Sequence, residues 1–376
     1  MKRALPGKFY LGALSQAPGL GGVSLARVLK FFESPEDAWD RGTVNDFLAA
    51  GLTVLQAESV TAHIKKRRDL PQELKELCDK KGIRLVGLDE EDYPRLLKEI
   101  YKPPAVLYCR GRLLKEEICL ALVGSRRMTP YGKKAAEVIA SGLARAGVTV
   151  VSGAAYGIDS AAHVGALKVP ESRTIAVLGC GVDVAYPRSH EKLLEEIAQR
   201  GAVISEYPPG TTPQPGFFPQ RNRIIAGMSH GAVVVEAAER SGSLITAELA
   251  LSEGRDVFAV PGSIFSAASE GTNRLILQGA KLVRSAADII SEYPWLVHPV
   301  DGAGARTKGE TGPKLSPEEK QVYDLLLTDT PLTIDDVIYR LHGKGEASNI
   351  AFVLLQLEMK GLAESDASHG YTKTVI

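Results

Sequence analysis

The sequence predicts an α/β protein with a doubly wound, mostly parallel sheet and a smaller domain on either side of it. Two observations carry this prediction. From residue 118 onward, short and almost continuously apolar runs alternate with helical patterns, as in parallel strands that helices cover on both faces. Glycine-rich turns follow several of these runs, which places the turns at strand ends. The length of 376 residues allows two or three domains.

The first predicted domain spans residues 1–80 and is helical. Apolar residues at three- and four-residue spacing predict helices over 20–32 and 47–64. The turn Pro18-Gly19-Leu20-Gly21 resembles a helix-hairpin-helix element, whose backbone amides can meet a phosphate. An ordinary helix–helix turn stays open as the alternative, because Gly and Pro are common turn residues. We therefore expect a SAM-like or helix-hairpin-helix-like domain.

The second predicted domain spans residues 81–295 and holds the sheet, with an extension before it. The extension contains strand-like runs at 83–86 and 103–108. Ligands of doubly wound sheets bind beyond the carboxyl ends of the strands. The expected elements are strands at 118–123, 148–152, 174–178, 202–205, 232–236 and 256–260, with helices at 133–146, 190–200 and 244–252.

The last predicted domain, residues 315–376, follows a linker at 296–314 that has no apolar pattern. Ser316 with Glu319, and Thr333 with Asp336, have the spacing of capping boxes and mark two helix starts. Three helices and a hairpin together resemble a winged helix. The expected elements are helices at 316–327, 333–341 and 348–360 and a hairpin at 361–373.

Charge is balanced over the chain but not along it. The 45 Lys+Arg and 45 Asp+Glu give zero formal net charge, which argues against a highly basic coating protein but not against a local basic groove. Residues 300–376 contain eight Lys/Arg and twelve Asp/Glu. A winged helix that reads duplex DNA presents a basic face, so we expect this domain to serve protein contacts or regulation.

Four cysteines, Cys78, Cys109, Cys119 and Cys180, occur without a CxxC pair. Their spacing supports neither a disulfide framework nor a metal site and predicts buried, reduced thiols. The first residues have no apolar run of signal-peptide length, and no segment approaches the roughly 20 apolar residues that cross a bilayer. We therefore expect a cytoplasmic protein with no membrane partner, no metal and no cofactor.

Residues suited to anion binding gather in the turns at the predicted strand ends. Glycine permits close backbone approach, helix N-termini offer N–H groups, and arginine adds positive charge. Because the carboxyl ends of parallel strands meet at one edge of a sheet, we expect one phosphate-binding crevice there. Its candidate residues are Gly124, Ser125, Arg126, Arg127, Gly153, Gly157, Asp159, Gly181, Arg221, Asn222, Arg223, Gly242 and Ser243.

Several of these features also have a simpler interpretation. Gly179-Cys180-Gly181 is half of a dinucleotide fingerprint, but the third Gly is absent, so the support for NAD is weak. His163 is a candidate base, although a lone His near a helix start is more often structural. Asp159 is by default a helix cap. Ser243 lies outside any G-x-S-x-G motif, so a nucleophile elbow is not supported. The turns contain no complete catalytic set, and we expect no catalytic residues among them.

The ordered motifs of residues 105–285 closely resemble those of one family, the bacterial DNA-processing protein A (DprA/Smf) family. His190 departs from the family's pattern, which usually has Asn after Tyr-Pro. The motifs are Val-Gly-Ser-Arg at 123–126, Ser-Gly-Ala-Ala-Tyr-Gly-Ile-Asp at 152–159, Gly-Cys-Gly-Val-Asp at 179–183 with Tyr186-Pro187, Ser-Glu-Tyr-Pro at 205–208, Phe-Pro-Gln-Arg-Asn-Arg-Ile-Ile-Ala-Gly at 218–227, Ser-Gly-Ser-Leu-Ile-Thr-Ala at 241–247 and Phe-Ala-Val-Pro-Gly at 258–262.

This resemblance implies a non-enzymatic protein whose Rossmann-like domain binds single-stranded DNA, protects it and loads the RecA recombinase onto it during natural transformation. It also implies a homodimer formed through that domain, and it places Arg126 in the family's basic DNA pocket. The alternative is a nucleotide-processing enzyme, such as a phosphoribohydrolase on a similar scaffold, with Asp159 or Glu236 as acid or base. The Pro-Gly-Gly-x-Gly-Thr signature of that group is absent from the sequence.

Overall fold

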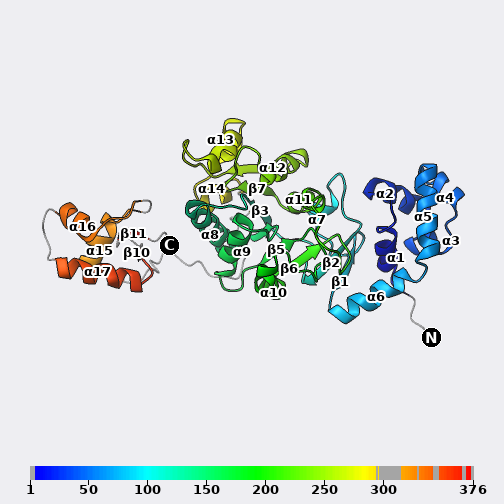
Figure 1. Cartoon of the computed structure of the whole chain (residues 1–376), viewed down its shortest axis with the longest axis horizontal. Helices are drawn as coiled ribbons and strands as arrows, with labels where there is room; N and C mark the ends of the chain where they lie inside the picture. The colour runs from blue at the N-terminus through cyan, green and yellow to red at the C-terminus, as the bar shows by residue number, and fades with distance from the viewer. Residues whose placement is uncertain are drawn as a thin grey trace. The chain divides into compact units, whose positions relative to one another are not determined.

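The computed structural model describes residues 5–293, 295, 315–327, 330–341, 347–365 and 370–373. The chain divides into two compact units, Met1–Leu296 and Val297–Ile376. Among the described residues, the first unit contains the sheet and the N-terminal helices, and the second contains further helices and a hairpin (Figure 1). The predicted linker at 296–314 lies outside the described residues.

Within the described residues, nine strands form one sheet in the order β1-β2-β6-β5-β4-β3-β7-β8-β9. β2 pairs antiparallel with β1 and β6, and the other pairs are parallel. The chain runs from central β3 outward to β6 and then returns to β7 on the other side of β3, which makes the end of β3 a switch point. The strands are β1 (Arg84–Gly87), β2 (Val106–Gly111), β3 (Cys119–Val123), β4 (Thr149–Ser152), β5 (Thr174–Val177), β6 (Ala202–Ser205), β7 (Gly231–Val234), β8 (Asp256–Ala259) and β9 (Lys281–Leu282).

Helices cover both faces of the sheet, as predicted (Figure 1). Leu120 and Leu122 of β3 belong to a buried cluster with α8 and α9, whereas Ala121 and Val123 belong to another with α11 and α12. Both faces are therefore buried, which explains the continuous apolar runs. The elements are α7 (Arg95–Lys98), α8 (Pro130–Arg145), α9 (Ile158–Leu167), η1 (Arg188–His190), α10 (Glu191–Arg200), α11 (Phe217–Gly227), α12 (Gly242–Ser252), η2 (Ala267–Ser269), α13 (Glu270–Leu277) and α14 (Ala286–Ile290).

Helices also fill the N-terminal part, but the single helix predicted over 47–64 is wrong. Gly51, with φ +86°, ends the first half in a left-handed conformation that favours glycine. Thr53 then begins a new helix with Gln56 in a capping box. The helices are α1 (Gly7–Leu14), α2 (Gly22–Phe31), α3 (Pro35–Arg41), α4 (Val44–Ala49), α5 (Val54–Lys66) and α6 (Leu70–Lys81).

The N-terminal helices share a hydrophobic core with the sheet, although the sequence predicts a separate domain for residues 1–80. Phe9 of α1 and Leu74 of α6 belong to the same buried cluster as Tyr108 of β2 and Val203 of β6. Burial of apolar surface is the main stabilising contribution to folding, so these helices and the sheet stabilise each other. Helices and sheet accordingly form one unit.

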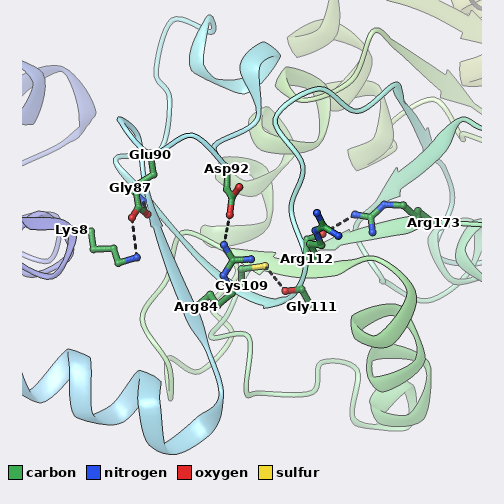
Figure 2. Close-up of polar contacts among 9 residues, drawn as sticks. All are labelled: Lys8, Arg84, Gly87, Glu90, Asp92, Cys109, Gly111, Arg112 and Arg173. Carbon is green, nitrogen blue, oxygen red and sulfur yellow. Dashed lines mark hydrogen bonds and ion pairs between the residues drawn. The ribbon is translucent and has the colours of Figure 1, made fainter. Parts of the chain in front are cut away.

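Polar contacts reinforce this junction (Figure 2). Lys8 Nζ of α1 lies 2.9 Å from Glu90 Oε1, and Glu90 Oε2 accepts a hydrogen bond from the Gly87 amide at 2.9 Å. Arg84 of β1 pairs with Asp92 in the same loop. Helix α1 is thus held to the loop that follows β1.

The described residues of the second unit form three helices, a two-stranded hairpin and a hydrophobic cluster of their own. Ser316 with Glu319, and Thr333 with Asp336, form the two predicted capping boxes. Val337 and Leu354 lie in the cluster, which contains residues of this unit alone. The elements are α15 (Pro317–Leu325), α16 (Ile334–Arg340), α17 (Ala347–Met359), β10 (Ala363–Ser365) and β11 (Tyr371–Lys373).

All four cysteines are free and buried, as predicted. Burial raises the pKa of the Cys78 and Cys180 thiols to about 11 and that of Cys109 to about 12. In the described part of the chain, no group of three or more His, Cys, Asp or Glu side chains is placed to hold a metal ion. None of its helices combines the length and apolar character needed to cross a bilayer.

Candidate nucleic-acid interface

A cavity of about 610 Å³ lies at the carboxyl edge of the sheet, beside the end of β3. The turns after β3 and β7, the start of α9 and helix α11 form its wall. A hollow of about 30 Å³ adjoins it and shares Arg126, Tyr186, Phe218 and Arg221. The predicted site residues that line the two are Gly124, Ser125, Arg126, Arg127, Gly153, Asp159, Arg221, Asn222, Gly242 and Ser243.

Three exposed arginines give this cavity positive charge. Arg126 and Arg127 lie in the turn between β3 and α8, and Arg240 lies in the turn before α12. The candidate residues named from the sequence omit Arg240, although its turn, which also holds Gly242 and Ser243, is one of those predicted to reach the crevice. The signal that selects Arg126 therefore also applies to Arg240.

Arg221, Asn222 and Arg223 lie within helix α11, whereas the sequence suggests a turn. The prediction is wrong because Pro219, which normally interrupts helices, lies in the first turn, where its missing N–H needs no partner. Successive residues of a helix are about 100° apart around its axis. Adjacent side chains of α11 therefore face different surroundings.

Arg221 is a buried residue of the cavity wall and bonds α11 to the sheet. Its buried guanidinium donates to the Gly153 carbonyl oxygen at 2.7 Å and to the Val177 carbonyl oxygen, at the ends of β4 and β5. A Cβ atom at Gly153 would collide with this guanidinium, so a larger residue there would displace the Arg221 side chain. Arg221 thus joins α11 to the sheet and places a charge beneath the cavity.

Arg223 lies outside the cavity wall and pairs instead with Glu206. Two positions along the helix separate it from Arg221, so the two guanidinium groups point in different directions. Only one of these two arginines is therefore brought to the cavity.

Asp159 is the carboxylate in the cavity wall, in the first turn of α9. Burial raises the pKa of Asp159, and the Arg221 charge together with hydrogen bonds to the backbone of Ala155 and Gly153 opposes this rise. Gly157, the residue before α9, has φ +81°, and a Cβ atom there would collide with the Ser125 carbonyl oxygen. Gly157 therefore supports the turn that carries Arg126 and does not itself line the cavity.

Gly181 likewise lies beside the cavity wall and not in it. A Cβ atom at this position would lie 2.7 Å from Asp183 Oδ1 and 2.8 Å from the Pro208 carbonyl oxygen. The glycine therefore allows two loops to pack closely.

Aromatic rings lie among the arginines. Tyr186 and Phe218 line the cavity with their ring centres 5.4 Å apart, and the Arg126 guanidinium lies 5.3 Å from the centre of the Phe218 ring. The second distance is within cation–π range. Tyr156 lines the adjoining hollow, whereas Phe217 stacks on Tyr207 at 4.1 Å.

Two candidate acid–base residues have structural contacts. His163 is fully buried, with Nδ1 2.7 Å from Thr174 Oγ1. The Thr174 hydroxyl donates a hydrogen bond to the Val150 carbonyl oxygen, so towards His163 it can only accept. Nδ1 of His163 therefore carries the hydrogen and donates to Thr174. Burial lowers the pKa of His163 to about 3. The Glu236 carboxylate accepts from the Thr129 amide at 2.9 Å and from its hydroxyl, at the start of α8.

His190, which departs from the family's motif, supports the turn after β4. Its Nδ1 lies 3.0 Å from the Ala154 carbonyl oxygen, and its ring packs edge-on against Tyr156 at 5.2 Å. The position therefore contacts the hollow beside the cavity through Tyr156.

The comparisons with known proteins agree on one family. The family model for DNA recombination-mediator protein A matches residues 84–294. The DNA processing protein DprA of Bacillus subtilis is 45% identical over 215 residues, which cover 57% of this chain and 72% of that protein. The X-ray structure of DprA from Streptococcus pneumoniae aligns with a TM-score of 0.67 at 37% identity, over 78% of this chain and 99% of that one.

A structure of DNA processing protein A from Helicobacter pylori, which concerns the single-stranded DNA binding mode of that protein, also aligns. Its TM-score is 0.51 at 32% identity, over 56% of this chain and 94% of that one. The family match covers more than half of the chain and includes the cavity with Arg126 and Phe218. The chain therefore belongs to the DNA recombination-mediator protein A family.

Proposed function

We propose that this chain binds single-stranded DNA in the 610 Å³ cavity and acts in recombination by delivering the bound strand to a RecA-type recombinase. One observation carries the proposal: exposed arginines and accessible aromatic rings line the same cavity, at the switch point of the sheet. The arginines can bind phosphates, and the aromatic rings can bind bases. No catalytic step is part of this proposal.

The phosphate-binding part rests on charge. Arg126, Arg127 and Arg240 reach the cavity from two turns, with Arg221 beneath it, against the single carboxylate of Asp159. Guanidinium groups form charge-assisted and often bidentate hydrogen bonds with phosphate oxygens. Contacts of this kind position a strand without reading its sequence.

The preference for a single strand rests on the aromatic rings. Tyr156 and Tyr186 are 54% and 41% exposed. Stacking of a base on an aromatic side chain contributes about 1–3 kcal/mol and needs a base that is free of its duplex neighbours. A duplex would offer the same phosphates but no free base faces.

Family membership supports the recombination step. We propose that the protein protects incoming single strands in the cytoplasm and loads RecA onto them during natural transformation. The test is RecA filament formation on DNA coated with single-strand-binding protein. Addition of this protein should accelerate filament formation, and the Arg126→Ala variant should not.

We also propose a homodimer formed through the Rossmann-like domain. Ile264, Phe265 and Leu277 are strongly exposed, and Leu282 lies exposed in β9 at the edge of the sheet. Exposed apolar side chains near a strand edge favour association with a second chain. Light scattering after size exclusion should give twice the chain mass, and the double variant Phe265→Glu, Leu277→Glu should give the monomer mass.

The decisive experiment measures the affinity for single- and double-stranded oligonucleotides of one sequence by fluorescence anisotropy across a salt series. We expect tighter binding to the single strand and a slope of log K against log[salt] of about −0.7 per neutralised phosphate. Equal or tighter binding to duplex at moderate salt would contradict the proposal.

A matched pair of variants locates the site. Arg126→Ala should weaken single-strand binding about tenfold or more, because a charge-assisted contact contributes about 1.5–3 kcal/mol. Arg145→Ala is the control, since Arg145 is exposed at the end of α8 that points away from the cavity. Release of free base from nucleoside monophosphates would instead support the nucleotide-processing alternative.

A further inference from the structure

The segment that follows β5 contacts both the N-terminal helices and the cavity. Leu178, Cys180 and Val182 belong to the buried cluster that contains α1 and α6. A few residues later, Tyr186 lines the cavity. Residues 178–186 therefore connect the N-terminal helices to the cavity wall.

Asp183 is the polar centre of this segment. Its carboxylate pairs with Lys81, the last residue of α6, and its Oδ1 accepts from the Gly210 amide at 2.7 Å. The Asp183 side chain is 13% exposed and that of Lys81 is 38% exposed, so water only partly screens the pair. Burial by itself raises the pKa of Asp183, but Lys81 and the Gly210 amide outweigh it and leave the pKa lowered. The carboxylate is therefore charged near neutral pH.

Two hydrogen bonds join the segment of Asp183 to the segment of Gly210, and each segment leads to an aromatic ring. The Gly210 amide donates to Asp183, and the Gly181 amide donates to the Thr211 carbonyl oxygen at 2.9 Å. From Thr211 the chain continues to Phe218, and from Asp183 it continues to Tyr186. The spacing of the two rings, 5.4 Å between centres, therefore depends on how these segments are joined.

We propose that Asp183 and Lys81 are positioning residues of the nucleic-acid site, through which the N-terminal helices fix the spacing of Tyr186 and Phe218. The inference rests on the proposed function, because the two rings are the faces offered to bases. Lys81 and Asp183 act without contacting DNA, since both lie outside the cavity wall. The N-terminal helices are then part of the support of the site.

The test compares two charge reversals in the full chain by anisotropy with a single-stranded oligonucleotide. Lys81→Glu sets a like charge against Asp183 and should weaken binding about three- to tenfold, whereas Lys81→Arg should bind like the parent. Lys8→Glu is the matched control: it breaks the Lys8–Glu90 pair between α1 and the loop that follows β1 (Figure 2). Neither Lys8 nor Glu90 lines the cavity. Lys8→Glu should leave the affinity unchanged. If Lys81→Glu does not fold, Lys81→Met removes the charge and should show the same direction.

A double-mutant cycle separates positioning from a general loss of stability. If Lys81 acts through Tyr186, Lys81→Glu should cost little further affinity in a Tyr186→Ala background, a non-additive result that a merely structural role would not produce. Additive effects, or equal affinities of the Lys81→Glu and Lys8→Glu variants, would overturn the inference. If Arg126→Ala still lowers the single-strand affinity tenfold in that case, the proposed function holds without the positioning role of Lys81 and Asp183. A parent protein that does not bind single strands would overturn both.

Discussion

The N-terminal helices pack into the same hydrophobic cluster as β1, β2 and β6, whereas the helices of residues 315–373 bury their apolar side chains in a cluster of their own. The connections differ in the same way. Only two residues separate the end of α6 at Lys81 from the start of β1 at Arg84, while the predicted linker at 296–314 has 19 residues. A change from helical to strand-like sequence therefore marks a new kind of element, and a long polar stretch marks a new folding unit.

The largest effect on this comparison is expected from shortening one buried side chain in each hydrophobic core. Leu178→Ala and Leu354→Ala each remove a buried side chain and should each destabilise their unit by about 2–5 kcal/mol. Hydrogen exchange measured by mass spectrometry should show faster exchange in α1, α6 and the sheet together for Leu178→Ala. For Leu354→Ala, exchange should change in α15, α16 and α17 alone. Unchanged protection of α1 and α6 in Leu178→Ala would show that the core is not shared.

Mild acid should distinguish the two units next. His163 is neutral in the folded protein because burial, His190 and Arg221 lower its pKa to about 3, while the unfolded chain has the ordinary value of about 6.5. Below about pH 6.5 the unfolded chain takes up a proton on His163 that the folded protein does not bind. The free energy of unfolding is therefore unaffected by His163 above this pH and falls as the pH is lowered towards 3, by about 2 kcal/mol at pH 5.

The measurement is urea denaturation at pH 7 and pH 5 for the parent and His163→Gln. The variant should lack this part of the pH dependence, so the difference between the two proteins isolates His163 from other groups.

In the second unit, the side chain of Lys360 and the Ser316 amide lower the pKa of Glu319, so this contact persists down to the ordinary carboxylate range. An equal loss in both units between pH 7 and 5 would contradict the assignment.

The smallest effect is expected from removing the second unit. Truncation after Gly312 should change the single-strand affinity less than threefold, a shift below about 0.7 kcal/mol. The cavity residues all lie in the first unit, and residues 300–376 carry more Asp/Glu than Lys/Arg. A tenfold loss, with the sheet still folded by circular dichroism, would mean that the second unit contributes to binding.

The sequence was sufficient to predict elements that depend on local pattern. All six strands from 118 to 260 are confirmed, as are the capping boxes at Ser316 and Thr333. Helix α11 could not be predicted in this way, because Pro219 and a run of polar residues interrupt the apolar spacing from which a helix is predicted. The different surroundings of Arg221 and Arg223 follow from that helix and were missed with it.

The site shows the same division. The turn with Arg126 follows a strand directly, so its position at the carboxyl edge could be predicted from topology. Gly181 and Asp183 make contacts with residues distant in sequence, at Lys81 and Gly210, and no local pattern specifies those contacts. Residues that support the cavity were therefore harder to predict than residues that line it.

The buried cysteines have a practical consequence for work with this protein. A thiol with a pKa of about 11, such as Cys180, holds roughly one thiolate per thousand molecules at pH 8, and the thiolate is the species that alkylating reagents attack. Burial further restricts access by the reagent. Labelling with iodoacetamide should therefore follow the opening of the surrounding structure, so Cys180 can serve as a natural reporter of motion beside the cavity. A bound strand that holds this region closed should slow the labelling.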